Sequence, residues 1–156
     1  MFNMRAKQLF TVLFAIAIVT LLFSCGGGGG NTAQQTKTDA VATAPDLAAG
    51  QAIFEGKGTC VTCHQKDGKG VAGTFPPLAG SDYLLADKMR AVKQAIKGSA
   101  EPLTVNGAQY PGGIMTVVTL TDQEVMDVVN YALNSWGNKG GTVTLDDVKK
   151  VRESIK

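Results

Sequence analysis

The stretch Cys60-Val61-Thr62-Cys63-His64 is the most informative part of this 156-residue chain. It contains two of the three cysteines and the only histidine. Residues spaced three and four apart lie on the same face of one helical turn, so the two thiols and the imidazole can reach one common group. The chain therefore concentrates most of its thiol and imidazole chemistry in one short segment.

The spacing C-x-x-C-H is typical of c-type haem attachment. Each thiol can add to one vinyl group of the same porphyrin, and the following histidine is carried under the ring, where an imidazole nitrogen reaches the iron. We therefore predict that Cys60 and Cys63 hold a porphyrin covalently and that His64 is the proximal iron ligand. The predicted cofactor is one covalent haem c with its iron.

The motif has three other possible interpretations. A thioredoxin-like thiol pair belongs in a βαβ pattern, and no such pattern surrounds this stretch. A structural zinc site needs four nitrogen or sulfur ligands, and three ligands within five residues do not close a tetrahedron comfortably. A disulfide across so short a loop contributes little. Haem attachment is the favoured interpretation.

The first 24 residues have the pattern of an export signal. Arg5 and Lys7 precede an apolar run, Leu9 to Phe23, which is short for a membrane span and the right size for a signal-peptide core. The run ends in Leu22-Phe23-Ser24-Cys25, which resembles the bacterial lipobox and implies cleavage before Cys25 and lipidation of that cysteine. The alternative is an uncleaved N-terminal anchor. Either way we expect an extracytoplasmic domain tied to a bacterial membrane, inner or outer.

Residues 25–44 begin with a run of five glycines and continue with Thr, Gln and Ala, which predicts a flexible tether. Such a tether spans roughly 25 Å. The chain has 15 basic and 13 acidic residues, and loss of Arg5 and Lys7 with the leader makes the two numbers equal. The charge therefore does not indicate nucleic-acid binding.

Residues 45–137 are predicted to form one all-α domain, beginning with a helix at Pro45-Asp46. Asp46 is a good N-cap, and Leu47 and Phe54 recur at helical spacing. Gly50 within this helix is unfavourable by about 1 kcal/mol relative to alanine. A glycine at this position makes sense if another helix crosses very close to it.

A hairpin and three further helices follow in the prediction. Asn106-Gly107 is typical of a type I′ hairpin turn, and Thr121 with Glu124 forms a capping box. Gly98 and Gly137 are natural helix ends. The predicted elements are a helix over 81–97 capped by Ser81 or Asp82, a hairpin over 103–110, a helix from Thr121 to Trp136, and a helix over about 145–155 capped by Thr144. The last one makes residues 138–156 a C-terminal helical extension.

A short amphipathic helix, C-x-x-C-H, a proline-containing loop, a late methionine and a C-terminal amphipathic helix resemble a class I cytochrome c over residues 45–137. This resemblance implies a fold in which the N-terminal and C-terminal helices cross, with Gly50 and Phe54 meeting Tyr131. It also implies a mono-haem electron carrier that is not itself an enzyme.

The resemblance extends to the residue that orients the proximal histidine. Class I cytochromes use a proline carbonyl in a P-x-L segment for this purpose, and Pro76-Pro77-Leu78 is similar. The resemblance implies that Pro76 accepts a hydrogen bond from His64 and that Leu78 packs on the ring.

The sixth iron ligand is expected to be a methionine, because a chain with one histidine cannot supply two. Met89 lies in an apolar helical stripe and Met126 in the last helix of the domain, whereas Met115 follows a glycine-rich loop. Class I cytochromes place their axial methionine in such a loop, which implies Met115. His and Met ligation leaves no open iron position and favours electron transfer.

The partner class is suggested by a narrower resemblance. Residues 75–78 and 131–138 are similar to cytochrome c domains that accompany copper-containing nitrite reductases, and related domains accompany terminal oxidases and membrane dehydrogenases. This implies respiratory donor and acceptor proteins, with a copper nitrite reductase or a terminal oxidase as acceptor.

The sequence is compatible with two rival functions. Thr116-Val117-Val118 follows Met115 where many relatives have prolines, and a labile sixth ligand would make the protein a haem-based gas sensor or weak peroxidase. The other rival is a membrane-tethered thiol module without haem.

Overall fold

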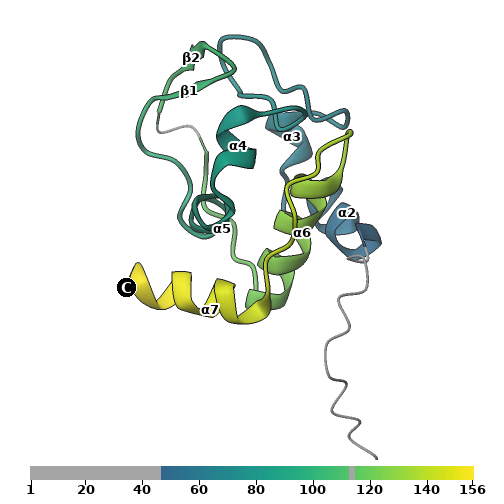
Figure 1. Cartoon of the computed structure of the whole chain (residues 1–156), viewed down its shortest axis with the longest axis vertical. Helices are drawn as coiled ribbons and strands as arrows, with labels where there is room; N and C mark the ends of the chain where they lie inside the picture. Colours follow the sequence, from purple (N-terminus) through teal and green to yellow (C-terminus); the bar gives the residue numbers. More distant parts are fainter. Residues whose placement is uncertain (1–46, 113–114) are drawn as a thin grey trace, which may run out of the picture. The chain divides into compact units, whose positions relative to one another are not determined.

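The computed structural model describes residues 47–112 and 115–156 (Figure 1). These residues form six helices and one two-stranded antiparallel sheet. None of these helices is both long and apolar enough to cross a membrane. The predicted signal peptide, lipidated Cys25 and tether, and the Asp46 cap, lie outside the described residues.

The first described helix, α2 (Leu47–Glu55), packs against α6 (Asp122–Asn134). Gly50 is buried, and a Cβ atom on it would lie 2.2 Å from the Asp127 carbonyl oxygen and 2.6 Å from the Tyr131 Cβ. Phe54, one turn further on, has its ring centroid 5.4 Å from that of Tyr131. The predicted close approach of the two helices at a glycine is confirmed.

The prediction of one helix over 81–97 is wrong. The chain forms α4 (Asp82–Ala86) and α5 (Lys88–Lys97), separated at Asp87, whose backbone is extended with φ −150°. The Asp87 carboxylate accepts hydrogen bonds from the backbone N–H of Met89 and of Arg90, at 2.9 and 3.0 Å. Asp87 therefore caps a second helix instead of continuing the first. The predicted end of the segment at Gly98 is confirmed.

The predicted hairpin is confirmed as β1 (Leu103–Val105) paired with β2 (Ala108–Tyr110). Asn106 and Gly107 have φ values of +51° and +78°, and both must be positive in a type I′ turn. The Asp82 carboxylate accepts a hydrogen bond from Asn106 N–H at 2.8 Å. This bond joins the turn to the start of α4.

The end of α6 differs from its prediction. The helix ends at Asn134 and not at Trp136, whose backbone has a left-handed φ of +54°. The Trp136 ring packs 5.4 Å from that of Phe54, and its Nε1–H donates to the Lys66 carbonyl at 3.0 Å. The apolar pattern continues to Trp136, but the helix ends two residues earlier. We attribute the earlier end to these tertiary contacts of the Trp136 ring.

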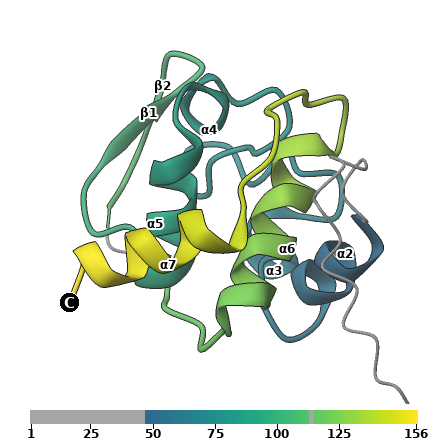
Figure 2. The ribbon, with the colours of Figure 1, turned by 60° about the horizontal axis from the view of Figure 1, so that its bottom comes forward.

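The predicted last helix is confirmed as α7 (Leu145–Ser154), with Thr144 as its N-cap. It lies across α5 and α6 (Figure 2). The core lies between these elements and α2. Its most deeply buried large side chains, all less than 2% exposed, are Phe54, Leu133, Val92, Val105, Val125 and Val148.

The capping box at the start of α6 gives a pH prediction. Two contacts, first the Lys57 ammonium at 2.7 Å and then the Thr121 N–H, lower the pKa of Glu124 to about 2. A carboxylate with a depressed pKa stabilises the fold above its ordinary pKa, near 4.5, and loses that effect as pH falls toward 2. Glu124→Gln keeps the cap but cannot ionise. In this variant the free energy of unfolding, measured with urea, is expected to depend less on pH between pH 4.5 and pH 2.

Lys57→Ala is the matched control for this prediction, because it removes the largest cause of the shift and leaves Glu124 in place. In this variant the free energy of unfolding should begin to fall at a higher pH, closer to 4.5, than in the wild type. Equal pH profiles for wild type and Glu124→Gln would contradict the assignment.

Candidate haem-binding site

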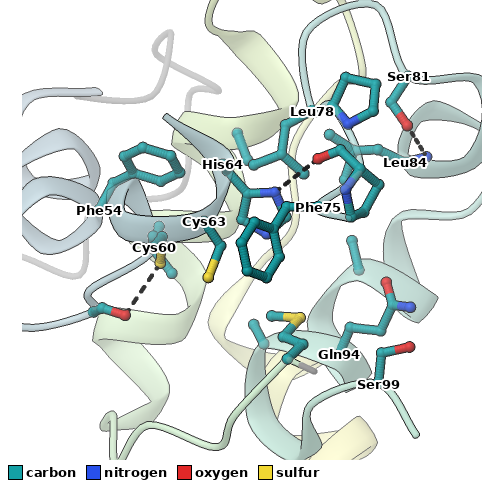
Figure 3. Close-up of a pocket in the computed structure, with 18 of the residues that line it drawn as sticks. Phe54, Cys60, Cys63, His64, Phe75, Leu78, Ser81, Leu84, Gln94 and Ser99 are labelled. Carbon is teal, nitrogen blue, oxygen red and sulfur yellow. Dashed lines mark hydrogen bonds between the residues drawn. The ribbon is translucent and has the colours of Figure 1, made fainter. Parts of the chain in front are cut away.

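The CVTCH stretch forms a single helical turn. The structure places Val61–His64 in the short helix α3, with Cys60 immediately before it. His64 N–H donates to the Cys60 carbonyl at 2.9 Å, which fixes the first and last residues of the motif to one another. Figure 3 shows Cys60, Cys63 and His64 on one wall of the pocket, with Gln94 and Ser99 on the facing wall.

Both thiols of the motif are free. The Cys60 Sγ–H donates to the Gly58 carbonyl at 3.4 Å, and burial raises the pKa of the Cys60 thiol. The thiol is therefore protonated at neutral pH. Both sulfur-bearing residues line the same cavity as His64, as attachment to one porphyrin requires.

The imidazole of His64 has one defined partner. Its Nδ1 lies 3.0 Å from the Pro76 carbonyl oxygen. Because a carbonyl can only accept, Nδ1 carries the proton and Nε2 keeps its lone pair. Burial lowers the pKa of His64, and the hydrogen bond to Pro76 opposes that shift. The ring is thus held in the neutral form that binds metals.

The loop between His64 and Pro76 is closed by backbone hydrogen bonds. Gly70 N–H donates to the His64 carbonyl at 2.9 Å, and the Gly68 carbonyl accepts from Leu78 N–H at 2.7 Å. Gly70 has φ +65°, and a Cβ on it would lie 2.6 Å from the Pro76 carbonyl oxygen. Glycine at this position lets the loop pass directly beside the acceptor of His64.

Gly70→Ala is therefore expected to displace the Pro76 carbonyl and weaken its hydrogen bond to His64. A weaker bond makes the imidazole less basic, so the reduction potential of the haem-loaded protein should rise. The His64 Nδ1–H proton resonance should shift, and the free energy of unfolding should fall by about 3 kcal/mol from strain and crowding together.

Gly73→Ala is the matched control for this variant, since Gly73 has a similar φ of +72° and no atom within 4 Å of the added Cβ. It should show only the backbone strain, about 1–2 kcal/mol, with an unchanged potential. Identical potentials and identical His64 resonances in the two variants would refute the role of Gly70.

Met115 is far from His64 in the sequence but lines the same cavity. It pairs with Ser99 in an isolated antiparallel bridge, just after Gly98 ends α5. A Cβ on Gly98 would lie 2.3 Å from the Met115 carbonyl oxygen, so a glycine is needed for this approach. Met115 is 38% exposed.

The other two methionines of the described residues are placed elsewhere. Met89 and Met126 pack against the core, and neither is among the residues that line the cavity. Of the three methionines weighed from the sequence, the structure thus brings Met115 into one cavity with His64.

The cavity has a volume of about 330 Å³, within the range of small-molecule and cofactor sites. Its wall is mainly apolar and includes Leu78, whose packing on the haem ring stays a prediction. The six residues singled out from the sequence, all of which line the cavity, are Cys60, Cys63, His64, Pro76, Leu78 and Met115. An apolar wall with two thiols, an imidazole and a thioether fits a haem.

A polar group on the cavity wall was not found from the sequence. Gln94 Nε2–H donates to the Tyr83 hydroxyl at 3.2 Å, and the Arg90 guanidinium lies 3.7 Å above the Tyr83 ring. Among the described residues, the Arg90 Nε atom is buried without a hydrogen-bond partner. Tyr83 and Gln94 line the cavity, whereas Arg90, over the Tyr83 ring, is not among the lining residues. Tyr83 and Gln94 are 11 residues apart and lie on two different helices, so no local pattern indicates that they meet.

Comparisons of the sequence with known proteins identify the family. The family model for cytochrome c matches residues 47–136, more than half of the chain. The cytochrome c subunit of a quinone alcohol dehydrogenase from Komagataeibacter europaeus is 38% identical over 100 residues, which cover 61% of this chain and 21% of that subunit. Cytochrome c-552 from Thermus thermophilus is 33% identical over 102 residues, which cover 60% of this chain and 78% of that protein.

A third relative covers more of this chain. The cytochrome c subunit of gluconate 2-dehydrogenase from Pantoea cypripedii is 29% identical over 158 residues, or 88% of this chain and 32% of that subunit. The chain spans about a fifth to a third of the length of these dehydrogenase subunits. The zinc and haem-free thiol interpretations of the motif are excluded by the family. The chain belongs to the cytochrome c family, as a class I electron carrier whose cofactor is covalent haem c.

Proposed function

We propose that this chain is a membrane-tethered cytochrome that takes single electrons from a dehydrogenase and delivers them to a respiratory reductase or a terminal oxidase. The observation that carries the proposal is that His64 and Met115 line one cavity with both thiols. Cys60 and Cys63 would hold the haem covalently, while His64 and Met115 would ligate its iron. The bound haem would supply one-electron chemistry at a potential raised by the methionine.

The residues around the cavity support electron transfer over chemistry at the metal. With His64 and Met115 both holding a bound haem iron, no iron position would be open to a substrate. The Pro76 carbonyl holds the imidazole with its proton on Nδ1, burial favours the neutral ring, and the apolar wall, with Leu78, limits access of water.

The donor is proposed from the comparisons. Relatives from Komagataeibacter, Gluconobacter and Pantoea are named as cytochrome subunits of alcohol, fructose and gluconate dehydrogenases. Their similarity to this chain favours a dehydrogenase as electron donor. The acceptor is proposed from the resemblance of residues 75–78 and 131–138 to cytochrome domains beside copper nitrite reductases and terminal oxidases.

The membrane tether is proposed from the sequence. The apolar run before Cys25 and the glycine-rich stretch after it favour a lipidated cytochrome on the extracytoplasmic side, at the end of a tether over 25–44. Cys25→Ser should release haem-loaded protein from the membrane fraction into the soluble one. Retention of this variant in the membrane would favour an uncleaved N-terminal anchor.

The function is tested with purified, haem-loaded protein by stopped-flow spectroscopy. Reduction is followed after mixing with a quinone-dependent alcohol dehydrogenase and its substrate, and re-oxidation after mixing with a copper nitrite reductase and nitrite, or with a terminal oxidase and oxygen. Fast reduction with fast re-oxidation by one acceptor supports the proposal and identifies that acceptor. Slow transfer to both acceptors, with fast reduction, would remove the acceptor side of the proposal.

One observation favours a second candidate function. Residues 116–120 form no helix or strand, so a sixth ligand at Met115 would be easily displaced. A labile ligand suits a haem-based gas sensor or weak peroxidase. Rapid CO binding by the ferrous protein at neutral pH would favour this candidate, and slow CO binding would favour the carrier.

A further inference from the structure

The C-terminal extension, residues 138–156, lies beyond the part of the chain that the family model matches. It nevertheless contacts two segments of the haem site. The first segment, residues 78–80, comes directly after Pro76 and Pro77. The second runs from Met115 to the start of α6. The contacts are made by two polar side chains, Asn138 and Arg152.

The extension begins at the His64 side. Asn138 is buried, and its Nδ2–H donates to the Leu78 carbonyl at 2.9 Å and to the Ala132 carbonyl at 2.8 Å. Its Oδ1 accepts from Gly80 N–H at 2.8 Å. One amide therefore joins the segment after Pro76 to the end of α6.

The middle of the extension is fixed to α6. The buried amide of Asn130 donates to the Val143 carbonyl at 3.0 Å and accepts from Val143 N–H at 2.8 Å. Val148, in α7, is fully buried. Because the backbone and the apolar face of the extension are both engaged, α7 is a rigid base for the side chains it presents.

Arg152, on α7, contacts the end of the segment that follows Met115. Its Nη2–H donates to the Leu120 carbonyl at 3.1 Å, and its Nε–H donates to the Asp122 carboxylate at 2.5 Å. Both side chains are about one-third exposed. The guanidinium fork thus holds the end of the 115–120 segment and the first turn of α6 together.

The segment 115–120 is held mainly at its two ends. Residues 116–120 form no helix or strand, and the bridge from Met115 to Ser99 holds its other end. We propose that the C-terminal extension is a brace for the sixth iron ligand, with Arg152 as its positioning residue. The proposal rests on the proposed ligation of the iron by Met115.

The mechanism is a restriction of the ligand's freedom. When haem is bound, the Met115 thioether would be displaced only if its backbone segment moved away from the site. If Leu120 is held, the segment can move only by bending between two fixed ends. Loosening one end should therefore favour the displaced state and speed ligand exchange, without altering the thioether itself.

The test compares three haem-loaded variants. Arg152→Gln removes the fork, and Arg152→Lys keeps the charge but cannot serve both acceptors equally. Lys149→Gln is the matched control, because it removes the same charge from the same helix at a residue whose contact is a 4.0 Å surface pair with Asp146. The readouts are imidazole binding to the ferric protein, the pH at which the methionine–iron(III) charge-transfer band disappears, and urea unfolding.

Arg152→Gln should bind imidazole at least about threefold faster and lose the band at a pH lower by about half a unit. Arg152→Lys should fall between it and wild type, and Lys149→Gln should match wild type. If Arg152→Gln lowers only the urea midpoint, Arg152 is a docking residue of α7 and the proposal is overturned. A wild-type protein without the band would overturn the ligation by Met115 itself, which separates the two failures.

Discussion

Gly50→Ala is expected to lower the free energy of unfolding by about 2 kcal/mol, although alanine is the better helix former. Helix propensity alone predicts a gain of about 1 kcal/mol. The added Cβ would lie 2.2 Å from the Asp127 carbonyl oxygen and 2.6 Å from the Tyr131 Cβ. Because both obstacles belong to the backbone or start of a side chain on α6, the helices must separate, and overpacking of this kind costs about 1–3 kcal/mol.

Urea unfolding of the haem-loaded protein measures this effect. Ala49→Gly is the matched control, because it makes the reverse exchange at an exposed position of the same helix. It should cost about 1 kcal/mol by propensity alone. A Gly50→Ala protein that is more stable than wild type would show that α2 and α6 tolerate a wider spacing than the structure has.

The sequence predicted the features that depend on neighbouring residues. CVTCH indicated haem because its thiols and imidazole are within one turn. Asn106-Gly107 specified a turn because both positions need positive φ. Thr121 and Glu124 specified a helix start because their bonds are reciprocal and local. Each of these signals is complete within five residues, so no knowledge of the fold is needed to read it.

The sequence did not predict features that tertiary contacts decide. An aspartate such as Asp87 is compatible with a continuous exposed helix, and its extended backbone depends on how α4 and α5 pack. Trp136 continues the apolar pattern of α6, but its ring packs against Phe54 and binds the Lys66 carbonyl after the helix has ended. Arg152 lies 30 residues from Asp122 in sequence, so its contact with the Met115 side has no local signal.

The roles of the six cavity residues remain predictions that the structure makes testable. Their convergence on one cavity could be anticipated for Cys60, Cys63 and His64 from spacing alone. For Pro76, Leu78 and Met115 it depended on resemblance to a family, because 12 residues or more separate each of them from His64. Measurement of the iron ligands is therefore most informative at Met115, which is the most distant in sequence.

Met115→Ala is expected to change the iron site more than any other single substitution outside CVTCH. The wild-type protein should be low-spin in both oxidation states, show the methionine–iron(III) charge-transfer band and bind CO slowly. The variant should lose the band, bind CO rapidly in the ferrous state, and have a lower reduction potential by on the order of 0.1 V, a part of the roughly 0.8 V range that axial ligands cover. Absorption spectra with and without CO, and a redox titration, measure these effects.

Met89→Ala is the matched control, because it removes a half-buried methionine that packs on the core and does not line the cavity. It should be destabilised by about 2 kcal/mol or more from the lost packing, with an unchanged spectrum and potential. The two variants thus separate ligation from packing. If Met89→Ala and not Met115→Ala lost the band, the assignment of the sixth ligand would be wrong. If the wild type were high-spin and bound CO at once, the iron would have an open position, and the gas-sensing or peroxidase function would replace the carrier.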